Sequence, residues 1–113
     1  MEARLPAHIE ALGLIRQVQA AGGFGMVIQK GEHDAGTLIV VLTENGTNTR
    51  VYERLPTVDG DRNWSLSKKE NPENKEEFNQ YLRRRGEQDP DTWIIELDIA
   101  QGERFIGLST PQG

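Results

Sequence analysis

Apolar residues recur every three or four positions near the start of the chain, and this spacing predicts a helix from about Pro6 to Ala21. Proline suits the first turn of a helix, and the Gly22-Gly23 pair is a natural stop. The apolar side chains fall into two groups, Leu5, Ile9 and Leu12 on one side and Ala11, Leu14 and Val18 on the other. We expect so wide an apolar arc to pack against a sheet and also against another surface.

The hydrophobic period changes to two at Phe24, which is typical of a strand with Phe24, Met26 and Ile28 on one face. The next run, residues 37–42, is apolar on both faces and predicts a central strand. Glycines at both ends of the polar connection between them, residues 30–36, are ordinary turn chemistry. We therefore interpret this connection as a hairpin loop between neighbouring strands.

A third strand follows at residues 49–55, because Asn45-Gly46 is the strongest short hairpin signal and alternation resumes after it. The three strands are expected to form a meander. Residues 56–62 are expected to be a loop. Trp64 and Leu66 then fit a short fourth strand with both large side chains pointing inward.

The second predicted helix starts at Asn71-Pro72, a capping residue followed by a first-turn proline, and runs to about Arg85, closed by Gly86. Its apolar stripe is thin and consists of Phe78, Tyr81 and Leu82. Such a helix is expected on the surface of the sheet or across its edge.

A type I turn at residues 89–92 precedes the clearest half-buried strand, in which Trp93, Ile95, Leu97 and Ile99 alternate with Ile94, Glu96 and Asp98. Residues 104–108 follow a turn at Gln101-Gly102 and are expected to form a last edge strand. The element order α-β-β-β-β-α-β(-β) predicts an α+β fold with a mainly antiparallel sheet of four to six strands and two helices on one face. Residues 1–113 are expected to form one domain, with about 109–113 as a frayed tail.

Composition narrows the class of protein. The chain has no cysteine, which excludes disulfides, thiol catalysis and thiolate zinc sites. No apolar run approaches the roughly 20 residues of a membrane helix, and the start of the chain, with its acidic Glu2, does not resemble a secretory signal, so a cytoplasmic location without membrane contact is expected. The net charge of −5 has the wrong sign for neutralising phosphates and argues against duplex DNA as a partner.

The connection KGEHDAG, residues 30–36, carries the most suggestive chemistry. Glu32, His33 and Asp34 could offer a metal ion three ligands, but consecutive loop residues rarely converge on one ion. The only other histidine, His8, would have to come from the first helix. The sequence therefore predicts no metal site and no cofactor, and Asp34 is the residue of this loop most worth testing.

Arg83, Arg84 and Arg85 lie at the end of the second predicted helix, where cations complement the helix dipole. One or two of them could also bind a carboxylate or phosphate of a partner. Together with Tyr81 and a tryptophan they could instead bind single-stranded nucleic acid, provided that the aromatic rings are exposed beside them. Trp64 and Trp93 fall on the inward register of their strands and are expected in the core or at its edge.

Two short motifs resemble those of a known family. They are the turn Lys30 to Gly36, with Asp34 and Gly36 in matching positions, and the stretch Asp89-Pro90-Asp91-x-Trp93 that leads into IIELD and then GERFI. The likeness extends from the first helix to Phe105, and the family is an uncharacterised group of short alphaproteobacterial proteins with a domain of unknown function. The family pattern leaves the position of His33 free. The resemblance implies no activity, substrate or cofactor. It implies that a shared site involves the matching residues Asp34, Gly36, Asp89, Pro90, Asp91 and Trp93.

No GxSxG or other assembled catalytic group occurs, so we expect a small non-enzymatic protein that binds another protein or its own copy. The candidate binding residues are Asp34, Gly36, Arg83, Arg84, Arg85, Asp89, Asp91 and Trp93. The alternative is a metal-dependent or small-molecule enzyme that uses the acidic turns at residues 30–36 and 89–93. These alternatives differ in whether the two turns meet in space around a pocket.

Overall fold

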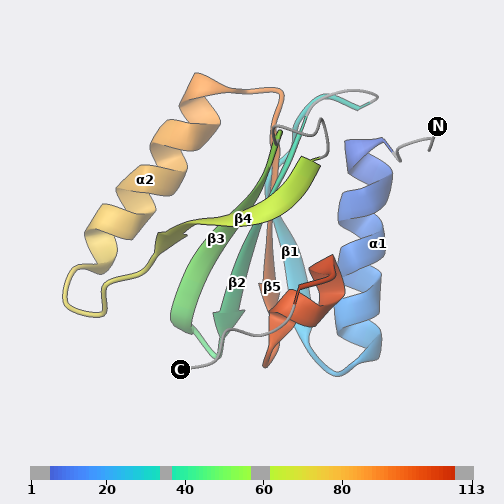
Figure 1. Ribbon diagram of the computed structural model, residues 1–113, viewed down its shortest axis with the longest axis horizontal. Helices are drawn as coiled ribbons and strands as arrows, with labels where there is room; N and C mark the ends of the chain where they lie inside the picture. Colours follow the sequence, from blue (N-terminus) through green and yellow to red (C-terminus); the bar gives the residue numbers. More distant parts are fainter. Residues whose placement is uncertain (1–5, 34–36, 57–61, 109–113) are drawn as a thin grey trace.

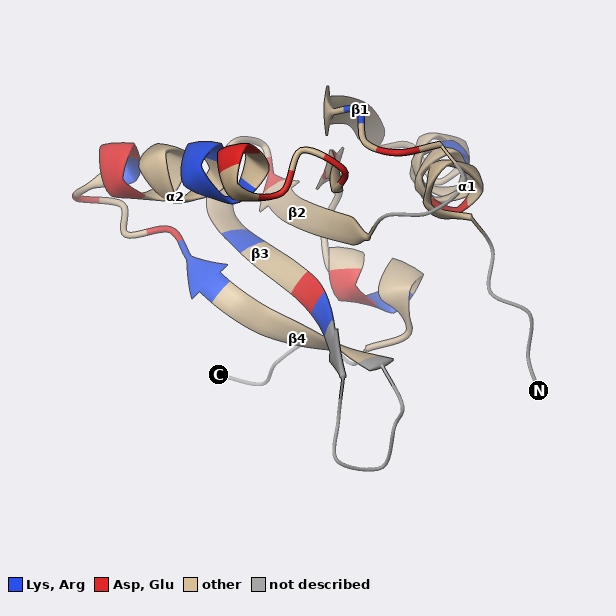
Figure 2. Ribbon diagram, turned by 90° about the horizontal axis from the view of Figure 1, so that it is seen from above, with Lys and Arg blue, Asp and Glu red and all other residues tan. Residues whose placement is uncertain are grey.

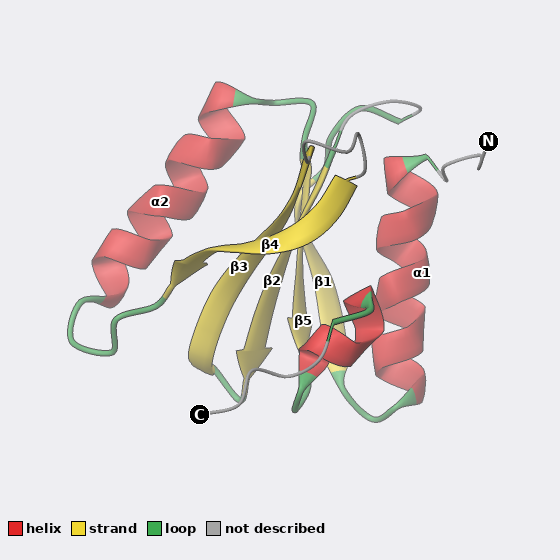
Figure 3. Ribbon diagram, viewed as in Figure 1, coloured by secondary structure: helices red, strands yellow, loops and turns green. Residues whose placement is uncertain are grey.

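The computed structural model describes residues 6–33, 37–56 and 62–108. Its elements are α1 (Ala7–Ala20), β1 (Phe24–Gln29), β2 (Leu38–Glu44), β3 (Thr47–Pro56), β4 (Arg62–Lys69), α2 (Lys75–Gln88), β5 (Trp93–Asp98) and the 3-10 helix η1 (Gly102–Ile106). Figures 1 and 3 show one twisted sheet between the two α-helices. The predicted α+β class and element order are confirmed. The predicted frayed tail and most of the predicted loop at residues 56–62 lie outside the described residues.

The sheet has the strand order β1-β5-β2-β3-β4, in which β5 pairs in parallel with β2 and the other three pairs are antiparallel. The predicted hairpin between β2 and β3 is confirmed, with Asn45 and Gly46 at positive φ of 56° and 78°. The predicted meander of the first three strands is wrong, because β5 inserts between β1 and β2. The strands on either side of residues 30–36 are therefore not hairpin partners, because β1 and β2 each pair with β5 instead of with each other.

Two hydrophobic clusters lie on opposite faces of the sheet, so the prediction that both helices share one face is wrong. On one face α1 packs through Ala7, Ala11, Leu14, Ile15 and Val18 onto alternate residues of β2 and β5. On the other face Phe78, Tyr81 and Leu82 of α2 pack onto Ile39, Val41, Val51 and Ile94. Residues 38–42 are buried on both faces, as their apolar pattern predicts. The exposed side of α1 carries Ile9 and Leu12, which are 45% and 43% exposed.

Helix α2 begins later and ends later than predicted. The side chain of Asn74, rather than Asn71, caps it by accepting a hydrogen bond from the backbone N–H of Glu77. Gly86 does not end the helix: it lies inside it, where an added Cβ would come within 2.3 Å of Oε1 of Gln29. The glycine lets α2 approach the end of β1, and this close approach joins the helix to the sheet edge.

The segment after β5 is a 3-10 helix rather than the predicted edge strand. Glu103 in η1 is 2% exposed and accepts two hydrogen bonds from Arg50, from Nε at 2.9 Å and from Nη2 at 2.6 Å. The hydroxyl of Tyr52 donates a third at 2.8 Å. These contacts attach η1 to β3 through a buried ion pair.

Trp64 and Leu66, the two large side chains of β4, were both predicted to point inward, and the structure confirms this only for Trp64. Trp64 is partly buried against the α1 side of the core, with the guanidinium of Arg54 at 4.5 Å from its ring centroid. Leu66, expected to point inward, is 44% exposed. Leu66 lies opposite Tyr52 in the register, on an edge strand that has a neighbouring strand on one side.

Candidate functional site

The two turns that the sequence singles out do meet, at the start of β5. The backbone N–H of Glu32 donates to the carbonyl of Asp91 at 2.9 Å, and Nε1 of Trp93 donates to the carbonyl of Glu32 at 2.7 Å. Gly31 is required for this contact, since an added Cβ would lie 2.2 Å from the carbonyl oxygen of Asp91. The matched motifs therefore build one structural corner, held mainly by backbone atoms.

Both histidines lie at this corner. The rings of His8 and His33 stack with centroids 3.7 Å apart, and Nδ1 of His8 is 2.5 Å from the carbonyl oxygen of His33. No group of three or more metal-ligating side chains occurs in residues 6–33, 37–56 and 62–108. Asp34 and Gly36, two of the predicted site residues, lie outside these ranges.

The remaining predicted residues of this corner have structural partners. The backbone N–H of Thr92 donates to the carbonyl of Asp89 at 3.0 Å, which closes the predicted turn. Nε2 of Gln29 donates to the carbonyl of Thr92 at 2.8 Å and ties the turn to β1. Trp93 is 4% exposed and belongs to the core, as predicted.

The three arginines of α2 have different surroundings. Arg85 donates from Nη2 to Oε1 of Glu53 at 2.6 Å, and Tyr81 donates from its hydroxyl to Oε2 of the same carboxylate at 2.8 Å. Burial by itself raises the pKa of Glu53, but the hydrogen bonds from Arg85 and Tyr81 outweigh it and the pKa is lowered. Arg83 and Arg84 are exposed, whereas Tyr81 is half-buried and engaged. The geometry thus offers no exposed ring of Tyr81 on which a nucleotide base could stack.

A second region, which the sequence prediction missed, is an uncovered part of the sheet on the α2 side. We call it the open half-face and define it by Phe24, Met26 and Ile28 of β1 with Glu96 and Asp98 of β5. The three apolar side chains are 74%, 55% and 42% exposed. Phe24 lies opposite Asp98 and Met26 opposite Glu96 in the strand register. Apolar side chains so exposed and so close together are typical of interaction surfaces.

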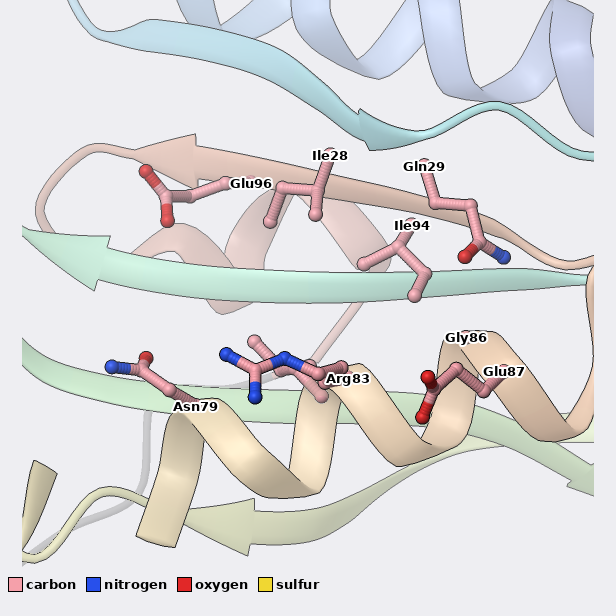
Figure 4. A pocket seen from close by; sticks show the side chains of 9 residues that line it. Ile28, Gln29, Asn79, Arg83, Gly86, Glu87, Ile94 and Glu96 are labelled. Atoms are coloured by element: carbon pink, nitrogen blue, oxygen red, sulfur yellow. The ribbon is translucent and has the colours of Figure 1, made fainter. Parts of the chain in front are cut away.

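A groove separates the open half-face from α2 (Figure 4) and has a volume of about 480 Å³. Its lining residues are Ile28, Gln29, Asn79, Leu82, Arg83, Gly86, Glu87, Ile94 and Glu96. Arg83 and Glu87 come from the exposed side of α2, whose charged residues are coloured in Figure 2, and Glu96 faces them from β5. Among the predicted site residues that the structure describes, only Arg83 lines this groove.

Glu96 is the half-buried carboxylate of this region. Its carboxylate forms no hydrogen bond or ion pair with another side chain in the described part of the chain, although its backbone pairs within the sheet. Burial raises the pKa of Glu96, and the negative charge of Asp98 adds to the effect. Asp98 in turn accepts a hydrogen bond from the backbone N–H of Asn45 at 2.8 Å. An acidic group without a cation is therefore held between exposed apolar side chains.

Sequence reasoning could not find the open half-face, although one signal was present. β1 contains no charged residue between Phe24 and Gln29, whereas β4, the other edge strand, contains Arg62, Lys68 and Lys69. Natural proteins protect an exposed edge with charges. An uncharged edge strand indicates a binding surface, but only the strand order shows that β1 lies at an edge.

The protein has an α+β fold with a mixed five-stranded sheet and one α-helix on each face of the sheet. The chain belongs to the family described as Protein of unknown function (DUF1491), which it matches over residues 5–107. The expected membership of an uncharacterised bacterial family is confirmed. No curated protein matches the chain.

Solved structures of the family share this fold. The NMR structure of a DUF1491 family protein from Caulobacter crescentus is 25% identical, with a TM-score of 0.79 over 98% of this chain and 100% of that one. A crystal structure of a DUF1491 family protein from the same organism has 25% identity and a TM-score of 0.78, over 94% and 98% of the chains. The solution structure of Atu0922 from A. tumefaciens has 26% identity and a TM-score of 0.76, over 98% and 100%. These relatives are alphaproteobacterial, as the resemblance implies.

No helix in the described part of the chain combines the length and the hydrophobicity needed to cross a bilayer.

Proposed function

We propose that this protein is a non-enzymatic binding protein that contacts another protein molecule, a different chain or its own copy, through the open half-face. The observation that carries the proposal is the exposure of Phe24, Met26 and Ile28 side by side on an uncharged edge strand. Surfaces of this kind reduce the solubility of a free protein unless a partner covers them. The proposal includes a cytoplasmic location, which fractionation of the producing cells tests.

Exposed apolar area gives the proposal its energetic basis. Burying a phenylalanine, methionine or isoleucine side chain is worth about 1.5–3 kcal/mol each when it starts fully exposed. Phe24 at 74% and Met26 at 55% exposure can each contribute a large part of that amount. Because a groove lies beside them, Phe24 and Met26 are suited to be hot spots, the few residues that contribute most of the binding energy of an interface.

In-cell crosslinking tests the proposal. A photoreactive amino acid is placed at Met26, and the matched control carries it at Gln19, which is exposed on α1 away from the open half-face. We expect a discrete protein adduct from position 26 and none of that mass from position 19. The substitution Phe24→Ser should abolish the adduct while leaving the melting temperature unchanged, because Phe24 is largely exposed. No adduct at position 26, or the same adducts at both positions, would contradict the proposal.

A metal-dependent or small-molecule enzyme stays a second candidate, because the turns at residues 30–33 and 89–93 meet and both histidines lie there. If this region binds a metal, zinc or nickel should raise the melting temperature. The control is His8→Ala, which removes one of the two stacked rings. An unchanged melting temperature in the unsubstituted protein would remove the metal-dependent form of this candidate.

A further inference from the structure

α2 covers only part of its face of the sheet. Its apolar residues pack onto β2, β3 and Ile94 at the start of β5. β1 and the rest of β5 carry Phe24, Met26, Ile28, Glu96 and Asp98 on the same face, and no element within residues 6–33, 37–56 and 62–108 covers them. On the opposite face these two strands are covered by α1. The layer on the α2 side is therefore incomplete.

The size of the gap matches a helix. Neighbouring strands lie about 4.8 Å apart, so two uncovered strands span about 10 Å. A helix with its side chains is about 10–12 Å in diameter and packs on a sheet through one apolar stripe. The exposed side of α2, with Asn79 and Arg83, would form the second wall of its site.

Addition of a strand at the edge of β1 suits this surface less well. The register of β1 shifts between Val27 and Gln29, which marks a bulge. Bulges twist an edge away from regular pairing and are a common protection against strand addition. An added strand would also leave the faces of Phe24 and Met26 uncovered.

The charge of the open half-face indicates which helix it would take. Glu96 and Asp98 lie two residues apart on β5, and Glu96 has no cationic partner in the part of the chain that the structure describes. A second copy placed face to face across a two-fold axis would bring two such acidic pairs together, which is unfavourable. A lysine or arginine from a different chain would neutralise them. The net charge of −5 favours a basic partner for the same reason.

We propose that the open half-face binds an amphipathic helix of a different protein, with its apolar stripe on Phe24, Met26 and Ile28 and a lysine or arginine over Glu96 and Asp98. This inference rests on the proposed function and names the chemistry of the partner. The helix lies beside α2 and completes the second layer on this face of the sheet.

Two synthetic peptides test the inference. Both are 14-residue amphipathic helices of leucine with either lysine or glutamate, and each is titrated into the 15N-labelled protein while the amide NMR signals are followed. We expect the lysine peptide to shift signals of β1, β5 and the groove side of α2, and the glutamate peptide to shift none. Glu96→Gln should weaken the lysine peptide about fivefold, because the ion pair between the lysine ammonium and the carboxylate is replaced by a hydrogen bond to a neutral carbonyl. The matched control Glu73→Gln removes the same charge from an exposed position in the turn before α2 and should change the affinity less than twofold.

Three results would overturn the inference. They are equal binding of both peptides, shifts spread over all acidic surfaces with equal effects of the two substitutions, and a dimer in light scattering that Phe24→Ser converts to monomer. The crosslinking experiment tests the proposed function, and its outcome does not depend on whether the lysine peptide binds. An adduct at position 26 without lysine-peptide binding retains the proposed function and rejects the basic helix, whereas no adduct rejects the function itself.

Discussion

The buried ion pair between Arg50 and Glu103 offers the sharpest test of the energetics of this fold. The two side chains are 5% and 2% exposed, and their closest N···O distance is 2.6 Å. We consider Glu103→Gln, which preserves the shape of the side chain and removes its charge. The glutamine offers one acceptor oxygen in place of the two carboxylate oxygens of Glu103. Buried Arg50 and the hydroxyl of Tyr52 then compete to donate a hydrogen bond to that one oxygen.

Removal of one partner from a buried ion pair costs about 3–5 kcal/mol, because the other charge is left without compensation. Since glutamine retains one acceptor and Oε2 of Glu44 lies 3.5 Å from Nη2 of Arg50, we expect a loss near the lower end, about 3 kcal/mol. A domain of this size is typically stable by about 5–15 kcal/mol, so the variant should fold but be clearly weakened. At about 4 °C per kcal/mol, the melting temperature should fall by about 12 °C.

Urea and thermal unfolding, followed by circular dichroism, measure the effect. The matched control is Glu77→Gln, in which the same substitution removes an ion pair of similar length, 2.7 Å to Lys68, from an exposed site. Exposed pairs contribute little, so this variant should melt close to the unsubstituted protein. Equal losses in the two variants would refute the argument that burial sets the value of the pair.

A triple variant provides an independent check of the same reasoning. Arg50→Met, Tyr52→Phe and Glu103→Leu together remove the charges and the hydroxyl and leave apolar side chains. Such replacements in other proteins are often neutral or stabilising. We expect the triple variant to recover at least about half of the stability lost in Glu103→Gln, and a further loss would show that the network contributes specifically.

Other outcomes follow from the same structure. Gly31→Ala should lower the free energy of unfolding by about 1–3 kcal/mol, because the added Cβ would meet the backbone of Asp91. Gly13→Ala should raise it by about 0.5–1 kcal/mol, because Gly13 lies inside α1 with open space around it. Urea titrations measure both changes. Burial raises the pKa of Glu103, but its hydrogen bonds lower the pKa by a larger amount, so that it lies below 4.5. The stabilisation from the ionised carboxylate is therefore complete above pH 4.5 and is lost as the pH falls through the folded pKa. Glu103→Gln should flatten this part of the pH profile of stability. Burial, with the hydrogen bond to Glu103, raises the pKa of Tyr52 from 10.0 to about 12, so stability should decline between pH 10 and pH 12 as tyrosinate absorbance appears, and Tyr52→Phe should remove this decline.

The local pattern of the sequence was sufficient for most of the elements. The apolar spacing of the first helix places it within one residue of Ala7–Ala20, and the alternation after Thr92 predicts β5. The Asn45-Gly46 turn is specified by residues that tolerate positive φ, which is a property of the residues themselves. These features depend on interactions within a few residues, so they can be read along the chain.

The candidate site depends on contacts between residues far apart in the sequence, which a local sequence pattern does not predict. β5 lies between β1 and β2 and pairs with both, although each of these partners is more than 50 residues away in the sequence. That insertion leaves β1 at the edge and exposes Phe24 and Met26, which the alternation alone would place in a core. A strand's period shows which side chains share a face, but only the packed structure decides whether that face is covered.

The end of the chain follows the same rule. Residues 104–108 have the composition of an edge strand, yet η1 forms because Glu103 reaches Arg50 and Tyr52 on β3. The sequence by itself determined the elements, the tight turns and the family resemblance. The tertiary structure decided the strand order, the fate of this last segment and the existence of an open half-face, because each depends on which distant residues exclude water together.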